Sequence, residues 1–162
     1  MNKADTILNL FNSLKYGNGT YGLDGRHLIA HDGWDCGNYE LTSLVSGPGQ
    51  VMKAAFFDEN LLMSFEGAPF YIGDSAYFND NQFRSLHNIH THIKYIGGSL
   101  YLNGNPITSH VLGLLKIDGL KAVFLDDNGV QSILNKYLDN DRDILDCAEE
   151  LVEAGFEEYA QL

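Results

Sequence analysis

Apolar residues recur along the middle of the chain in one short frame. The frame is an apolar residue, any residue, an apolar residue, two polar residues, asparagine, any residue and a last apolar residue. It occurs at residues 55–62 (AFFDENLL), 76–83 (AYFNDNQF), 100–107 (LYLNGNPI) and 123–130 (VFLDDNGV). Residues 34–41 (WDCGNYEL) fit the frame with Tyr39 in the asparagine position. Self-similarity at a regular period predicts a repeat architecture rather than a set of separate hairpins.

Two further motifs run in phase with this frame. The asparagines fall at Asn60, Asn81, Asn105 and Asn128, in steps of 21, 24 and 23 residues. An apolar-x-Ser-apolar motif follows Tyr39, Asn60 and Asn81, as LTSL, LMSF and FRSL. After Asn105 it becomes ITSH at residues 107–110, where His110 takes an apolar slot. A third motif ends in Ile-Gly at residues 72–73 and 96–97. The insertion LHNIHTHIKY lengthens the third unit, so we expect a locally irregular stack.

The frame predicts a stack of short parallel strands. Its two leading apolar slots point inward from a strand, and the asparagine turns the chain while its amide bonds main-chain groups at the bend. Stacked units then form an asparagine ladder. One unit cannot bury its own apolar edge, so at least three must stack, and the sequence provides about five.

The frame L-x-L-x-x-N-x-L resembles the leucine-rich repeat, and the recurring LTSL, EGAP and IGG segments resemble short leucine-rich-repeat proteins encoded by bacteriophages. The resemblance covers roughly residues 20–130. It implies an α/β fold: a short leucine-rich-repeat solenoid with one parallel sheet. It also implies a phage accessory protein that works in the host cytoplasm and binds and inhibits a host protein, such as a defence factor.

The two ends of the chain change to a helical pattern, and together with the repeats they form one predicted domain. We expect an N-terminal helix or cap at residues 1–19, the repeat stack at 20–130 and an acidic helical C-terminal cap at 131–162. The last region divides into helices at 130–138 and 139–155, with Asp139 or Asn140 as the cap of the second and Gly155 as its stop. Its apolar face is predicted to comprise Ile144, Leu145, Ala148, Leu151 and Val152.

The charge narrows the class of partner. The chain carries a net charge of −12, and residues 139–162 account for −8 of it, with nine acidic residues against Arg142. Phosphate binding needs clustered Lys and Arg, so we expect no direct contact with nucleic acid or an anionic membrane. The acidity suits either a partner with a basic surface or simple solubility. Two cysteines and no long apolar segment predict a soluble cytoplasmic protein.

Candidate chemistry is sparse. His87, His90 and His92 lie close together in the sequence, which could serve a metal, but histidines packed in a return loop are the favoured interpretation. No nucleophile elbow, phosphate-binding glycine loop or isolated acid pair stands out, so we expect no enzyme, no cofactor and no metal. A metal- or ligand-binding enzyme remains the least favoured alternative.

The frame does locate a candidate surface. The residue between the two apolar slots points outward on the concave face, where four successive turns place an aromatic ring, and the next outward position is polar or acidic. The predicted partner-binding residues are Asp35, Phe56, Asp58, Tyr77, Tyr101, Phe124 and Asp126. Aromatic anchors with a polar rim are typical of protein-binding sites.

Two alternatives to this surface stay open. The rings could serve only to stabilise the sheet, or they could be covered by the N-terminal helix or by a second copy of the chain. The leading prediction is a protein-interaction module. Its main alternative is a self-assembling structural or virion-associated protein, and a homo-oligomer is compatible with both.

Overall fold

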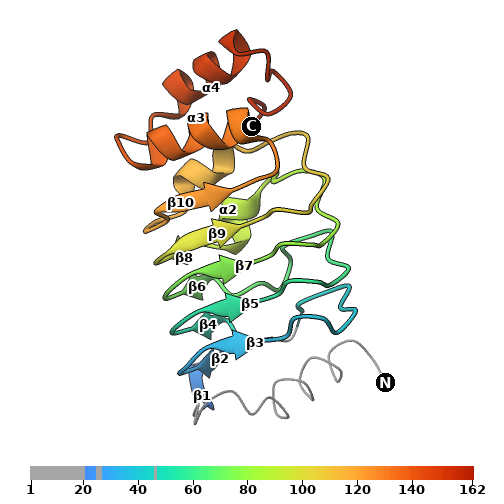
Figure 1. The fold of residues 1–162 in the computed structure, drawn as a ribbon. Helices are drawn as coiled ribbons and strands as arrows, with labels where there is room; N and C mark the ends of the chain where they lie inside the picture. Colours follow the sequence, from blue (N-terminus) through green and yellow to red (C-terminus); the bar gives the residue numbers. More distant parts are fainter. Residues whose placement is uncertain (1–20, 25–26, 46) are drawn as a thin grey trace.

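The chain winds into a column of parallel strands with two sheets running along it. The computed structural model describes residues 21–24, 27–45 and 47–162, so the predicted N-terminal helix at 1–19 lies outside the described residues. In Figure 1 one sheet lies in front and the other behind, and each has five strands. The prediction of a parallel solenoid of about five turns is confirmed.

The front sheet contains the predicted strand of each turn. Its strands are β3 (Trp34–Asp35), β5 (Ala55–Phe56), β7 (Ala76–Tyr77), β9 (Ser99–Tyr101) and β10 (Ala122–Phe124). They follow one another in chain order and all pair in parallel. Equivalent positions of successive turns are therefore direct neighbours, as the repeat frame predicts.

A back sheet was missing from the prediction. It comprises β1 (Tyr21–Asp24), β2 (His27–Ala30), β4 (Gln50–Val51), β6 (Tyr71–Ile72) and β8 (Tyr95–Ile96), with the β1–β2 pair antiparallel and the others parallel. The sequence at residues 20–33 predicts one or two edge strands, and β1 and β2 lie there. Strands β4, β6 and β8 have two residues each, which is too short to show the alternation that identifies a strand in a sequence. The repeated Ile-Gly motif was the signal for β6 and β8.

The glycines of that motif allow the turns to stack closely. A Cβ added at Gly73 would lie 2.0 Å from the carbonyl oxygen of Met52, and one at Gly97 would lie 2.1 Å from that of Gly73. Because both sheets repeat at the same strand spacing, the two sides of the column rise equally with each turn. The column is nearly straight (Figure 1), so the front sheet lacks the concave curvature that the sequence analysis expected.

The core fills the space between the two sheets and the return segments. Val51, Ile72 and Ile96 face it from the back sheet, and all three are fully buried. Phe57 and Phe78 follow the front strands, and their ring centroids lie 4.6 Å apart. The small residues of the apolar slots are equally buried, so the frame was interpreted correctly there.

Three of the four predicted asparagines form a buried ladder. Asn81 shows its chemistry: its Nδ2 donates to the carbonyls of Phe57 (2.9 Å) and Phe78 (3.1 Å), and its Oδ1 accepts from the Leu62 amide (3.0 Å). Asn60 and Asn105 make the equivalent bonds one turn away on either side. Each rung thus ties its own turn to the preceding one.

The residue before each ladder position adopts a left-handed conformation. Its φ is 60° at Asn38, 54° at Glu59, 56° at Asp80 and 77° at Gly104. Side chains other than glycine rarely adopt this region. At Glu59 and Asp80 the turn is therefore stabilised by the bonds of the asparagine that follows rather than by local preference, whereas glycine at position 104 adopts it readily.

The fourth asparagine was predicted wrongly. Asn128 is exposed and begins helix α3 (Asn128–Leu138). Asp127 precedes it and its Oδ1 accepts from the amides of Gly129 (2.9 Å) and Val130 (3.1 Å), which is a helix N-cap. A cap residue in the polar part of the frame ends the repeat and starts the helix.

The two C-terminal helices lie where the sequence predicts them, but their bounds differ from the prediction, and the structure adds two short helices. The insertion forms α2 (Ile89–His92), a 3-10 helix η1 spans Leu112–Lys116, and α4 spans Ile144–Glu153. Asp143 rather than Asp139 or Asn140 caps α4, and Gly155 follows it with a φ of 88°.

The apolar face of α4 differs in part from the prediction. Leu151 is buried as expected and is joined by Cys147, whereas Leu145 is 74% exposed and Val152 is 47% exposed. Helix α4 packs against α3, and its buried residues Cys147 and Leu151 lie one turn apart on the same side of the helix.

Side chains of α3 bond the last strand of the front sheet. Asn135 accepts from the Val123 amide (2.8 Å) and donates to the Val123 carbonyl (3.0 Å), while Gln131 accepts from the Leu125 amide (2.8 Å). These bonds replace those that a further strand would make. α3 and α4 lie beyond β10 at the C-terminal end of the column (Figure 1).

Candidate protein-binding face

Four aromatic side chains form one continuous row on the outer face of the front sheet. Phe56, Tyr77, Tyr101 and Phe124 are in register on β5, β7, β9 and β10, and all four are half-buried. Successive ring centroids are 4.6, 4.5 and 4.7 Å apart, with interplanar angles of 6°, 4° and 7°. We call these four residues the ring row. The sequence predicted its members and their order.

The stacking decides which part of each ring a partner can touch. The centroid spacing matches the spacing of parallel strands, about 4.8 Å, so each inner ring has both faces against its neighbours. Ring edges and the hydroxyls of Tyr77 and Tyr101 are left to face outward. Burial, followed by the neighbouring Tyr101, raises the pKa of Tyr77, so the Tyr77 hydroxyl stays protonated at neutral pH.

Carboxylates gather beside the row at its β3 end. Asp35 is in register with Phe56, and its Oδ1 accepts from the Gly37 amide at 2.8 Å. A Cβ built on Gly37 would lie 3.2 Å from that Oδ1 and 3.0 Å from Oδ1 of Asp58. The two predicted carboxylates therefore converge over a residue with no side chain.

The electrostatics of this group are unfavourable to the fold. Burial raises the pKa of Asp58, and the nearby charges of Asp35 and Asp80 raise it further. A cation placed between these carboxylates would relieve the repulsion. The β3 end of the row is thus suited to a Lys or Arg side chain.

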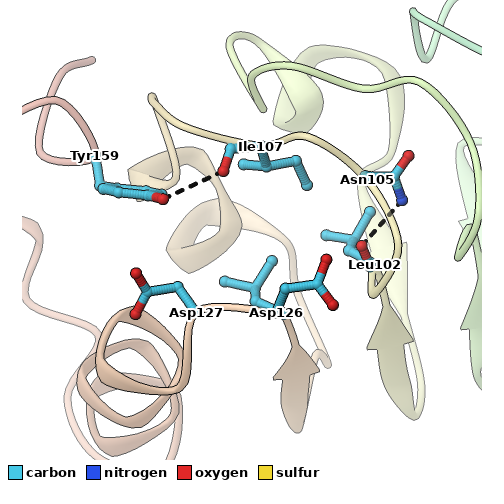
Figure 2. Close-up of a pocket in the computed structure, with 7 residues that line it drawn as sticks. Leu102, Asn105, Ile107, Asp126, Asp127 and Tyr159 are labelled. Carbon is cyan, nitrogen blue, oxygen red and sulfur yellow. Dashed lines mark hydrogen bonds between the residues drawn. The ribbon is translucent and has the colours of Figure 1, made fainter.

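Asp126, predicted to continue the polar side of the row, has a structural contact. Its Oδ2 accepts from the Gly104 amide at 2.9 Å, which ties the fifth turn to the fourth. It also borders a cavity of about 20 Å³ at the end of the asparagine ladder. In Figure 2, Asp126 and Asp127 form one wall of this cavity, and the Tyr159 hydroxyl donates to the Ile107 carbonyl on the other (3.2 Å). The cavity has room for about one water molecule and for no ligand.

The opposite sheet carries a shorter ring stack that sequence reasoning missed. Tyr71 on β6 and Tyr95 on β8 stack with centroids 4.8 Å apart and an interplanar angle of 7°. Their neighbour in register, Gln50, is not aromatic. The Tyr in the recurring Tyr-Ile-Gly motif was the available signal. This pair provides a chemically matched comparison for the ring row.

The predicted histidine trio does not converge. His87 contacts His110, with ring centroids 5.1 Å apart, and His90 lies over Gly113. Among the side chains that the structure describes (29–45 and 47–162), the only group of three or more potential ligands with atoms within 4.8 Å of one another is Asp141, Asp143 and Asp146. These three are exposed, and their contacts belong to the N-cap of α4.

Comparisons with known proteins do not place the chain in a family. No family model, curated protein or solved structure matches the chain. Within the part of the chain that the structure describes, no helix is long and apolar enough to cross a membrane.

Proposed function

We propose that this protein is an interaction module that holds a basic segment of a partner protein against the ring row and its acidic end. The observation that carries the proposal is the unbroken stack of four half-buried rings on the outer face of the front sheet. Ring edges and tyrosine hydroxyls give a flat surface that is apolar and also donates hydrogen bonds. Protein-binding sites use such surfaces as anchors.

The cost of Asp58 to the fold also supports binding. Burial and two neighbouring carboxylates disfavour its charge, so stability alone does not explain an acid at this position. A Lys or Arg of the partner would offset the repulsion and bury its alkyl stem on the ring edges. The net charge of −12 would speed the approach of a basic partner.

We further propose that the column is a leucine-rich-repeat protein of the bacteriophage type, acting in the host cytoplasm on a host protein. The asparagine ladder and its period support this assignment. In the same proposal α3, α4 and the C-terminal segment act as a cap. Its support is that Asn135 and Gln131 occupy the edge of β10, and that the carbonyl of Tyr159 accepts from the Val111 amide as a further turn would.

Selection from a random peptide library displayed on a surface tests the proposal directly. Enriched peptides should be rich in Lys and Arg, and their binding should weaken as salt rises. The double variant Tyr77→Ala/Tyr101→Ala should lose at least about tenfold in affinity, as removal of aromatic anchors does. The double variant Tyr71→Ala/Tyr95→Ala removes the same chemistry from the back sheet and should bind normally.

Equal loss in both double variants, or enrichment of acidic or uncharged peptides, would overturn the proposal. Light scattering after size exclusion tests the alternative function in the same samples. We expect a monomer. A stable dimer that the Tyr77→Ala/Tyr101→Ala change dissociates would assign the ring row to self-assembly instead.

A further inference from the structure

A second site lies in a pocket between the inserted helix α2 and the 3-10 helix η1. The pocket has a volume of about 220 Å³ and shares no residue with the ring row. It is lined by Leu86, His87, Asn88, His90, His110, Gly113, Lys116, Gln161 and Leu162. We call it the histidine pocket. Its members come from the third and fourth turns and from the last two residues, so only the folded chain assembles it.

The pocket is lined by basic side chains in an acidic protein. Every side chain in its lining that can carry a charge is positive when protonated: His87, His90, His110 and Lys116. None of the described residues that line it is Asp or Glu, although the chain has 22 of these residues. This local reversal of charge favours an anionic occupant.

The imidazole of His90 is held with unused hydrogen-bonding capacity. Its Nδ1 is buried and has no hydrogen-bond partner within the described part of the chain. A Cβ at residue 113 would lie 2.7 Å from this nitrogen, so glycine is needed there for the ring to occupy its position. Buried polar atoms without a partner are rare in native proteins, and a ligand would supply the missing partner.

The backbone of two lining residues is also unusual. Asn88 and His110 both adopt left-handed conformations, with φ of 61° and 58°. These conformations cost energy in residues other than glycine, and they cluster at binding sites. The rings of His87 and His110, which both line the pocket, meet edge to face, and Nδ1 of His110 lies 2.9 Å from Oγ of Ser109.

The spacing of the donors favours a polyatomic anion over a metal ion. A zinc ion holds its ligand nitrogens at about 2.0 to 2.1 Å and so needs them close together. Ligand atoms of these three histidines do not gather within 4.8 Å of one another. An oxyanion reaches several donors with different oxygens. We propose that the histidine pocket binds a phosphate group, with Lys116, His87, His90 and His110 as its hydrogen-bond donors.

Binding of the anion should be coupled to uptake of a proton. Burial lowers the pKa of His90, and the charges of Lys116, Lys94 and His87 lower it further, while His110 faces the same space. In the empty pocket His90 is therefore neutral at pH 7. An anion reverses the local potential, so affinity should rise as the pH falls below the ordinary histidine value of about 6.5.

Titration calorimetry with sulfate, inorganic phosphate and adenosine monophosphate tests the site. Sulfate keeps two charges across this range, so any change in its affinity between about pH 7.5 and about pH 5.5 reports the protein alone. We expect an affinity at least about tenfold higher at the lower pH, corresponding to one coupled proton. Tighter binding of adenosine monophosphate than of inorganic phosphate would assign the site to phosphate esters, and the reverse to the free ion.

Matched variants assign the effect to the pocket. His90→Gln and Lys116→Gln should each weaken sulfate binding about tenfold, as loss of a charge-assisted hydrogen bond does. His92→Gln on the same helix and Lys121→Gln outside the pocket should bind as the native protein does. Thermal unfolding of each variant, followed by circular dichroism, checks that the column is intact.

Three results would overturn the proposal. The first is the absence of binding by any of the three anions at about pH 5.5. The second is an equal loss in His90→Gln and His92→Gln. The third is stoichiometric binding of zinc with no binding of sulfate. Because the ring row is on another part of the column, the peptide selection described above is unaffected by any of these outcomes.

Discussion

Single asparagine side chains carry much of the cohesion between turns. Asn81 is 6% exposed, and its amide joins the main chains of two neighbouring turns. No other side chain of its size both donates to two carbonyls and accepts from an amide in this geometry. The ladder therefore explains why the frame keeps an asparagine in a buried place.

Replacing this residue should destabilise the whole column. Asn81→Ala leaves the buried Leu62 amide without its partner, and an unsatisfied group of this kind costs about 1–3 kcal/mol. The carbonyls of Phe57 and Phe78 each lose one of their two asparagine donors. We expect the free energy of unfolding in urea to fall by about 1–3 kcal/mol. Asn128→Ala is the control, because that exposed residue of the same frame has no ladder position. Equal effects of the two changes would contradict the ladder.

The raised pKa of Asp58 predicts an opposite effect at a neighbouring position. A carboxyl whose pKa is raised by folding holds its proton more tightly in the folded state. The ionised form therefore lowers stability once the pH exceeds that pKa. Asp58→Asn should unfold at higher urea concentration than the native protein at about pH 7 and at the same concentration at about pH 3.

Asp126→Asn provides the comparison for that experiment. Its carboxylate accepts a hydrogen bond from the Gly104 amide, so its neutral analogue should lower stability at about pH 7. A loss of stability in Asp58→Asn similar to that in Asp126→Asn would show that the Asp58 charge does not burden the fold.

At the scale of elements, α3 acts on the exposed edge of the last strand. Asn135 occupies both hydrogen-bonding groups of Val123. Asn135→Ala should lower the free energy of unfolding by about 1–2 kcal/mol and speed hydrogen exchange at the Val123 amide. Ser132→Ala, on an exposed position of the same helix, should do neither. Unchanged exchange at Val123 would mean that α3 does not hold this edge.

The elements also show where sequence reasoning works and where it fails. The front strands were predictable because each is anchored to an asparagine that recurs in a long frame. The back strands β4, β6 and β8 were not, because two residues cannot show a period and the stacking of these turns depends on the close approach at Gly73 and Gly97. Asn128 was misassigned because a frame does not distinguish a turn aspartate from the helix cap that Asp127 forms.

The two candidate sites also differ in how far the sequence could predict them. The ring row follows directly from register, since parallel pairing places one frame position above the next, and its order was predicted correctly. The histidine pocket combines His87 and His90 with His110, Lys116 and Gly113, which are distant in sequence. Only the fold of the insertion and the return segment brings these residues together.

At the scale of the whole molecule, the chain is a nearly straight column with chemically distinct sides. The front sheet carries four stacked rings and a cluster of acids, the back sheet carries one tyrosine pair, and the insertion forms a pocket lined by basic side chains. A rigid column of this kind presents its side chains with little loss of entropy on binding. In the proposed function, the front sheet is therefore the recognition surface and the back sheet supports it.

Hydrogen–deuterium exchange with and without a selected basic peptide tests that assignment most directly. We expect the peptide to slow exchange in segments that contain Tyr77, Tyr101 and the loop around Asp58, and to leave segments around Tyr71 and Tyr95 unchanged. Protection confined to the back sheet, or spread equally over both sheets, would contradict the account.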